Sequence, residues 1–181
     1  MLTLAEARSA LARAECLYDA AAVDRAVAAW AARIRADYAE RNPLVLCVLK
    51  GGVFASARLL AHLDFPLEFD CLQVGRYRNR TRGGDLDWRI HPETPLAGRD
   101  LLIVDDILDE GVTLAAVAAA CREEGAASVA LAVLARKARP VPPATEADYV
   151  ALTVPDRYVF GCGMDYRGYF RNLNAIWAID E

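Results

Sequence analysis

Short apolar runs alternate with segments of helical periodicity along most of this chain, and that alternation limits the folds that it can adopt. The run LVLCVL at residues 44–49 is too short for a helix and is bounded by a proline and a glycine, so it predicts a buried strand. A helical pattern follows it at residues 53–63, and a second apolar run at 101–105 precedes another helical pattern at 113–124. Such alternation predicts a mostly parallel sheet with helices on both faces, which binds ligands at the carboxyl ends of its strands.

The remaining segments complete one α/β domain, because 181 residues suit a single core. The sequence TLAE, which starts at Thr3, is a capping box that opens a first helix. Apolar residues at helical spacing from Val23 to Tyr38 predict a second helix, which ends near Pro43. Further strands are predicted at residues 67–74, 128–135, 149–154 and 158–161.

Residues 75–98 interrupt this alternation. They show no hydrophobic periodicity, contain Gly83 and Gly84, and carry four arginines between residues 76 and 82. Long irregular segments in compact domains are usually functional. We therefore predict a long loop or a mobile hairpin.

Charge and composition exclude several classes of function. The net charge of −4 and the pI near 5.3 provide no overall attraction to nucleic acid, so a polyanionic ligand needs a local site. No apolar run approaches the roughly eighteen residues of a membrane span, and charged residues interrupt the first twenty residues. The five cysteines include no C-x-x-C pair, and the two histidines have no partner at zinc-ligand spacing. We expect a cytoplasmic protein with reduced cysteines and no transition metal.

The stretch LLIVDDILDEGVT places acids between a predicted strand and a predicted helix. Asp105 and Asp106 should emerge where the strand ends, at the carboxyl edge of the sheet. The turn from Asp109 to Thr113 contains Gly111 and directs backbone N–H groups at a helix N-terminus, an arrangement that binds phosphate. Carboxylates would repel the phosphate but suit the vicinal hydroxyls of a sugar beside a Mg²⁺ ion. The alternative is an acidic strand-to-helix loop in which Asp109 only caps the helix.

This stretch closely resembles the phosphoribosyl diphosphate (PRPP) binding signature of the type I phosphoribosyltransferases. Three further segments, VLKGG, GRYRNRTRGG and PDRYVFGCGMDYRGYFRNL, resemble the hypoxanthine-guanine branch in the same order. The resemblance extends from about Val23 to Ile179. It implies a single domain with a central, mostly parallel sheet flanked by helices and a small hood that covers the base. Within that domain, residues 1–42 would form N-terminal helices, residues 75–98 a mobile loop and residues 155–181 the hood.

The resemblance implies how this chain would hold PRPP. Lys50, Gly51 and Gly52 match the loop around the diphosphate leaving group, where the Leu49–Lys50 bond can be cis in this family; alone, these residues would also suit a plain strand-to-helix turn. Arg171 matches an arginine that reaches the diphosphate. The residues that match the 5′-phosphate turn are Asp109, Glu110, Gly111, Val112 and Thr113.

The resemblance also implies a Mg²⁺ ion and a site for the ribose. Asp105 and Asp106 match the acidic pair at the 2′ and 3′ hydroxyls. Asp165 matches the Mg²⁺ ligand of the late segment, and we include Asp105 and Asp106 with it as candidate metal ligands.

The base-binding residues follow from the same resemblance. Asp109 matches the catalytic residue that faces the purine N7, Tyr158 matches the stacking aromatic, and Val159 matches the residue whose backbone reads the exocyclic edge. A strand lysine matches the donor to the 6-oxo group; we choose Lys137, although Arg136 lies one position away. Tyr158 could instead belong to the core, and the basic residues 136–139 could form a solvated turn.

Two departures from the family pattern affect the site. Many relatives have threonine where this chain has Glu110, whose carboxylate must point away from a phosphate. Many also have Ser-Tyr in the mobile loop where this chain has Arg76 and Tyr77, so the lid keeps its tyrosine but loses a hydroxyl.

The resemblance implies purine salvage, in which hypoxanthine or guanine reacts with PRPP to give IMP or GMP and diphosphate. One alternative is a transferase of this family that prefers xanthine. Another is an RNA-binding regulator on the same fold, which would use the arginines of the loop. The net negative charge argues against RNA binding, so we expect no nucleic-acid or membrane partner and, from the family, a homodimer or homotetramer.

Overall fold

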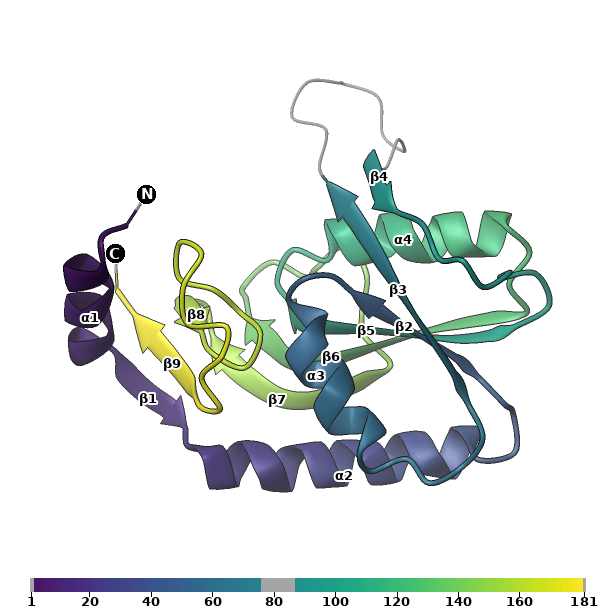
Figure 1. Cartoon of the computed structure of the whole chain (residues 1–181), viewed down its shortest axis with the longest axis horizontal. Helices are drawn as coiled ribbons and strands as arrows, with labels where there is room; N and C mark the ends of the chain where they lie inside the picture. Colours follow the sequence, from purple (N-terminus) through teal and green to yellow (C-terminus); the bar gives the residue numbers. More distant parts are fainter. Residues whose placement is uncertain (1, 76–86, 181) are drawn as a thin grey trace.

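A six-stranded sheet in the order β4-β3-β2-β5-β6-β7 runs through the centre of the protein (Figure 1). All neighbouring strands are parallel except β3 and β4, which are antiparallel. The computed structural model describes residues 2–75 and 87–180. In chain order, the strands of this sheet are β2 (Leu44–Val48), β3 (Glu68–Gly75), β4 (Asp87–Ile90), β5 (Asp100–Leu108), β6 (Ser128–Ala138) and β7 (Tyr149–Pro155).

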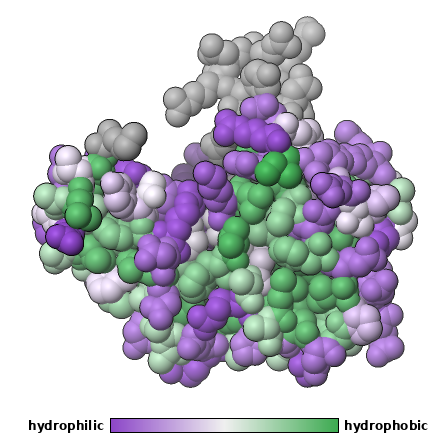
Figure 2. Space-filling view, in the orientation of Figure 1, coloured by the Kyte–Doolittle hydropathy of each residue, from purple (hydrophilic) through white to green (hydrophobic). Residues whose placement is uncertain are grey.

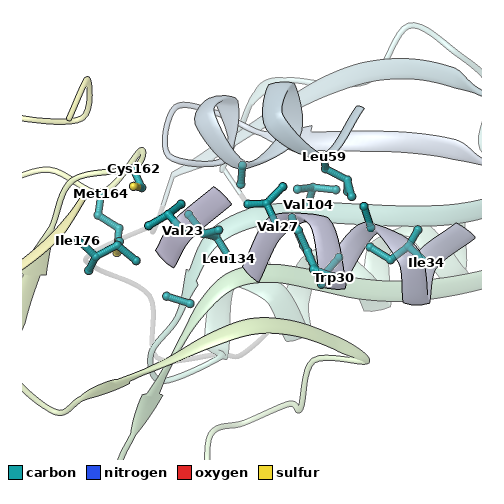
Figure 3. Packing of buried hydrophobic residues seen from close by; sticks show 14 of the residues in the cluster. Val23, Val27, Trp30, Ile34, Leu59, Val104, Leu134, Cys162, Met164 and Ile176 are labelled. Carbon is teal, nitrogen blue, oxygen red and sulfur yellow. The ribbon is translucent and has the colours of Figure 1, made fainter. Parts of the chain in front are cut away.

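Helices cover both faces of this sheet, because each central strand is apolar on both sides. In β2, Leu44 and Leu46 pack in the same cluster as Leu114 and Val117 of α4, whereas Val45 packs in the cluster of α2 and α3. Figure 3 shows the cluster of α2 and α3, in which Val27, Trp30 and Ile34 of α2 lie against the sheet. The helices are α1 (Leu4–Arg13), α2 (Ala20–Tyr38), α3 (Gly52–Leu60) and α4 (Val112–Glu123).

A second, antiparallel sheet in the order β1-β9-β8 joins the two ends of the chain. It consists of β1 (Glu15–Tyr18), β9 (Ile176–Ile179) and β8 (Tyr158–Phe160). Both termini lie beside it at one end of the molecule (Figure 1). In Figure 2, hydrophilic side chains border the recess between the lobe that carries α1 and the rest of the molecule.

The predicted α/β architecture is confirmed, but several strands differ from the prediction. Strands β1 and β9 were not predicted. Strand β4 pairs antiparallel with the end of β3, which agrees with the hairpin alternative for the segment 75–98. Strand β5 was expected to end at Asp105, but it continues to Leu108 because β6 pairs with it as far as Arg136. No helix within the described ranges is long and apolar enough to cross a membrane.

Candidate active site

Asp105 and Asp106 lie in β5 at the point where the neighbouring strand β2 has already ended. The pairing of β2 with β5 stops at Val104, whereas β6 still pairs with Asp105. Both acids therefore lie near the carboxyl end of the strand, as predicted, but Asp106 is within β5 and not just after it. The shorter β2 leaves room beside them for the loop that follows Val48.

That loop approaches Asp106 so closely that it has space only for glycine. A Cβ atom on Gly51 would lie 2.0 Å from Oδ2 of Asp106, and one on Gly52 would lie 2.6 Å from the carbonyl oxygen of Val104. A Cβ atom on Gly163, from the segment after β8, would lie 2.2 Å from the carbonyl oxygen of Gly51. Three distant segments therefore meet at the carboxyl ends of β2 and β5. The Leu49–Lys50 peptide bond is cis, the form that the family resemblance implied.

The buried environment of the acid pair makes ionisation of both side chains less favourable than in water. Burial, and next the neighbouring carboxylate of Asp106, raise the pKa of Asp105 well above its usual range. Burial also raises the pKa of Asp106, which is 9% exposed, although Arg171 opposes the shift. The backbone N–H of Asp106 donates to Oδ1 of Asp105 at 2.9 Å. A ligand with hydroxyl groups would meet the carboxyl groups of two adjacent residues at this position.

The turn after β5 has the geometry of an anion-binding turn. Gly111 adopts φ +73° and directly precedes α4, and no side chain caps this helix, so Asp109 is not its cap. Glu110 is exposed, and its carbonyl oxygen accepts a hydrogen bond from the N–H of Ala144 at 2.8 Å. This bond holds the loop between β6 and β7 against the turn.

A cavity of about 280 Å³ lies beside this turn. Its lining includes all three residues predicted to bind the base, and Tyr158 is fixed there by an edge-to-face contact with Tyr166 at a centroid distance of 5.3 Å. The cavity is lined by Asp106, Ile107, Asp109, Lys137, Tyr158, Val159, Met164 and Asp165. The structure thus brings the predicted phosphate turn and the predicted base site together.

Within this cavity, Asp109 and Lys137 form an ion pair. Nζ of Lys137 lies 2.9 Å from Oδ2 of Asp109, and the guanidinium of Arg139 donates to Oδ1. Burial alone would raise the pKa of Asp109, but Lys137 and Arg139 more than offset it and hold that pKa below its usual value. Arg136 lies apart from this pair, because its guanidinium is 3.3 Å from Glu146.

Asp165 and Arg171 lie on the opposite side of the site. The guanidinium of Arg171 donates to the Asp165 carboxylate and, at 2.6 Å, to the carbonyl oxygen of Gly163; it also lies 3.8 Å from Oδ2 of Asp106. The remaining oxygen of Asp165 accepts from the N–H of Gly168 at 2.7 Å. In the described part of the chain, no three His, Cys, Asp or Glu side chains are grouped to hold a metal. The three predicted metal ligands therefore do not form a preassembled cage. The predicted lid residues Arg76 and Tyr77 lie outside the described residues.

Comparison with known proteins identifies the family. Residues 14–167 match the phosphoribosyl transferase domain family. This chain belongs to that family. Hypoxanthine-guanine phosphoribosyltransferase from Streptococcus pneumoniae is 35% identical to it over 151 residues, which cover 83% of this chain and 84% of that protein. The Streptococcus thermophilus enzyme of the same name is 36% identical over 146 residues, 80% of this chain and 81% of that protein.

Solved phosphoribosyltransferases have the same fold. A hypoxanthine phosphoribosyltransferase from Staphylococcus aureus superposes with a TM-score of 0.85 at 26% identity, covering 92% of this chain and 91% of that one. A hypoxanthine-guanine-xanthine phosphoribosyltransferase gives a TM-score of 0.79 at 31% identity, covering 92% and 97%. A variant of the Trypanosoma cruzi hypoxanthine enzyme, solved with the product IMP, gives 0.82 at 27% identity and covers 92% of each chain.

Two residues at the site of this phosphoribosyltransferase were not predicted to act there. Arg139 was expected only in a solvated turn, yet it contacts Asp109. Asp156 received no role, although its Oδ1 lies 3.9 Å from both Lys137 and Arg139. The sequence did contain a signal for Asp156, because it stands two positions before Tyr158, next to the base site. Its partners, however, come from another strand, so spacing alone could not identify them.

Proposed function

We propose that this phosphoribosyltransferase transfers the 5-phosphoribosyl group of PRPP to hypoxanthine or guanine, giving IMP or GMP and diphosphate. The observation that carries the proposal is the pairing of Asp109 with Lys137 in a cavity that Tyr158 and Val159 also line. The names of relatives at 35% and 36% identity, and the IMP complex of the Trypanosoma cruzi enzyme, support it.

Lys137 and Asp109 suit the two polar edges of a 6-oxopurine. Lysine is only a donor, so it can donate to O6 of hypoxanthine or guanine but meets a donor in the amino group of adenine. A carboxylate is an acceptor and suits a proton on N7. The side chain of Lys137 is 15% exposed, so a mismatched base would place a second donor against a largely buried ammonium.

The acids of β5 suit the sugar of PRPP. When the bond between C1′ and the diphosphate oxygen breaks, the electron pair leaves with the diphosphate and positive charge develops on the ribose. Asp105 and Asp106 would hold the 2′ and 3′ hydroxyls and favour that charge. The N–H groups of Glu110, Gly111, Val112 and Thr113 would hold the 5′-phosphate at the start of α4, with the Thr113 hydroxyl as a further donor. Lys50, Gly51 and Gly52, with Arg171, would hold the diphosphate.

Proton transfer at the base falls to Asp109. As the lone pair of N9 attacks C1′, the proton on N7 passes to the Asp109 carboxylate. In the free protein this carboxylate is held by Lys137, so it becomes available when the ammonium turns to O6 of the bound base. Base binding would therefore prepare the acceptor for the N7 proton.

The donor set at this site fits Mg²⁺ that arrives with PRPP. Magnesium at phosphate substrates is commonly held by one or two carboxylates together with substrate oxygens, so a protein cage is not required. Asp165 and Asp106 both line the cavity, whereas Asp105 is not among the described residues that do. Asp165 and Asp106 are thus the two stronger candidate ligands. When bound, Mg²⁺ would neutralise charge on the diphosphate.

We further propose a cytoplasmic enzyme that assembles as a homodimer or homotetramer without nucleic acid. Its five cysteines are all free, and burial raises the pKa of Cys47 and Cys121 to about 11, which suits unreactive thiols. The oligomeric state is proposed from the family resemblance.

A product assay tests the proposed reaction. The protein is incubated with PRPP, Mg²⁺ and hypoxanthine, guanine or xanthine in turn, and diphosphate and nucleotide are measured. We expect one diphosphate to be released for each IMP or GMP formed. No nucleotide should form when PRPP or Mg²⁺ is left out. Xanthine enters the panel because a structural relative is named for it. Failure of all three bases to yield nucleotide would overturn the proposal.

A further inference from the structure

We propose that Arg139 is a positioning residue that holds the Asp109 carboxylate toward the base while Lys137 is engaged with the purine. The inference rests on the proposed function. It assigns to Arg139 a part in the reaction that is separate from contact with either substrate.

The two oxygens of Asp109 have different partners. Arg139 donates to Oδ1, whereas Nζ of Lys137 lies 2.9 Å from Oδ2. A purine that recruits Lys137 to its O6 atom removes the partner of Oδ2 and leaves that of Oδ1 in place. One oxygen stays anchored and the other is released toward the base.

Arg139 is well placed to act from behind the site. Asp109 and Lys137 line the base cavity, whereas Arg139 is not among its lining residues in the described ranges. Arg139 instead borders a neighbouring recess together with Pro140 and Pro143, and Lys137 lines both the recess and the base cavity. Its backbone N–H donates to the carbonyl oxygen of Lys137 at 3.1 Å, so the turn that ends β6 fixes its position. A guanidinium there can remain on Asp109 whether or not the cavity is filled.

The surrounding charges favour the same arrangement. Oδ1 of Asp156, from the turn between β7 and β8, lies 3.9 Å from both Lys137 and Arg139. Once Lys137 turns away, Arg139 is the remaining cation on Asp109. The nearby acids are Asp156 and Glu110, and Asp106 and Asp165 also line the cavity. Without Arg139, the Asp109 carboxylate would face these acids alone during base binding. It would then rotate more freely and take up a proton more readily.

A double-mutant cycle tests whether Arg139 acts through Asp109. We expect Arg139→Gln to lower kcat about tenfold, a fraction of the 10²-fold or more for the acid–base group itself. The KM for PRPP should stay within about twofold, and Arg139→Lys should recover most of the activity, because it keeps the charge. In an Asp109→Asn background, Arg139→Gln should change kcat by less than about twofold. Glu146→Gln, which breaks the neighbouring Arg136–Glu146 pair, is the matched control and should leave kcat unchanged.

The pH dependence separates this role from a purely structural one. Loss of Arg139 raises the pKa of Asp109, so the activity of Arg139→Gln relative to wild type should be lower at pH 5 than at pH 8. The ratio cancels the titration of PRPP itself. Equal effects of Arg139→Gln in the wild-type and Asp109→Asn backgrounds, or a ratio that is constant with pH, would overturn the inference. If Arg139→Gln does not fold, Arg139→Lys is measured alone, and a loss of more than tenfold despite the retained charge would overturn it. An inactive wild type would instead overturn the proposed function.

Discussion

At the scale of single residues, the charged side chains of the site are held in ion pairs with one another. Asp109 is held by Lys137 and Arg139, and Asp165 is held by Arg171. The sequence motif predicted Asp109 and Lys137 as site residues, because both match family positions, and the structure brings the two together in one cavity. The motif did not predict Arg139 as a site residue, because its partner lies 30 positions away and is met only through pairing of β5 with β6.

The role of Asp109 in proton transfer has a direct test. Asp109→Asn keeps the shape of the side chain but cannot take up the N7 proton, so we expect kcat to fall by about 10²-fold or more. PRPP affinity should change much less, because the phosphate turn donates through its backbone. Steady-state kinetics and PRPP binding by calorimetry measure the two effects. An unchanged kcat in a folded variant would remove Asp109 from the mechanism.

At the scale of elements, the unequal lengths of neighbouring strands determine the position of the candidate site. Strand β2 ends beside Val104 while β5 and β6 continue, and the loop after Val48 occupies the space that this offset leaves beside the acid pair. The apolar runs predicted the central strands, because buried parallel strands are apolar throughout. They could not predict β1, β4 and β9, which have four residues each and are defined by distant partners. The ends of β5 and β6 were also missed, since polar residues continue the pairing there.

One element contact makes stability depend on pH. In the segment after β4, Nδ1 of His91 lies 3.0 Å from the carbonyl oxygen of Pro92, and Nε2 lies 2.9 Å from Glu124 at the end of α4. Both partners are acceptors, so the protonated imidazole fits, and the hydrogen bond to Glu124 is the main reason that the pKa of His91 is raised. A raised folded-state pKa gives stability that is fully present below the unfolded pKa of about 6.5 and lost as pH rises through the folded value.

We therefore expect His91→Gln to destabilise the protein more at pH 5.5 than at pH 8.5. The side chains are 46% and 39% exposed, so the difference should be no more than about 1 kcal/mol in the free energy of unfolding. Urea denaturation at the two pH values measures it, with His62→Gln as the control. A destabilisation that is the same at both pH values would contradict this account of the contact.

At the scale of the whole molecule, one core joins the central sheet to the hood. Val159 and Met164, which line the base cavity, belong to the same buried cluster as Val27 and Trp30 of α2. Figure 3 shows Cys162, Met164 and Ile176 packed next to Val23 at one end of this cluster. The resemblance implied a hood, but its attachment to β1 through β9 depends on contacts between the two ends of the chain. Local sequence patterns cannot predict such contacts.

The hood also packs with α1 around a small second core, which should control base binding. Phe160 is fully buried there between Tyr166 and Phe170, at ring-centroid distances of 5.7 and 5.5 Å. Phe160→Ala should cost about 3–5 kcal/mol of stability and raise the KM for hypoxanthine more than that for PRPP. Ile34→Ala, in the main core, should cost about 2–5 kcal/mol without that selective change. Both are measured by thermal unfolding and by kinetics at a temperature where each variant is folded. Equal KM effects in the two variants would count against a separate role for the hood.

The most direct test of the central claim is the ratio of kcat/KM for hypoxanthine to that for adenine. Because Lys137 is a donor facing a largely buried position, we expect the wild type to prefer hypoxanthine by about 10⁴-fold. Lys137→Ala should reduce that ratio and leave PRPP affinity nearly unchanged, whereas Arg136→Ala, whose partner is Glu146, should preserve it. Adenine converted as fast as hypoxanthine, or selectivity lost with Arg136→Ala and kept with Lys137→Ala, would contradict the account.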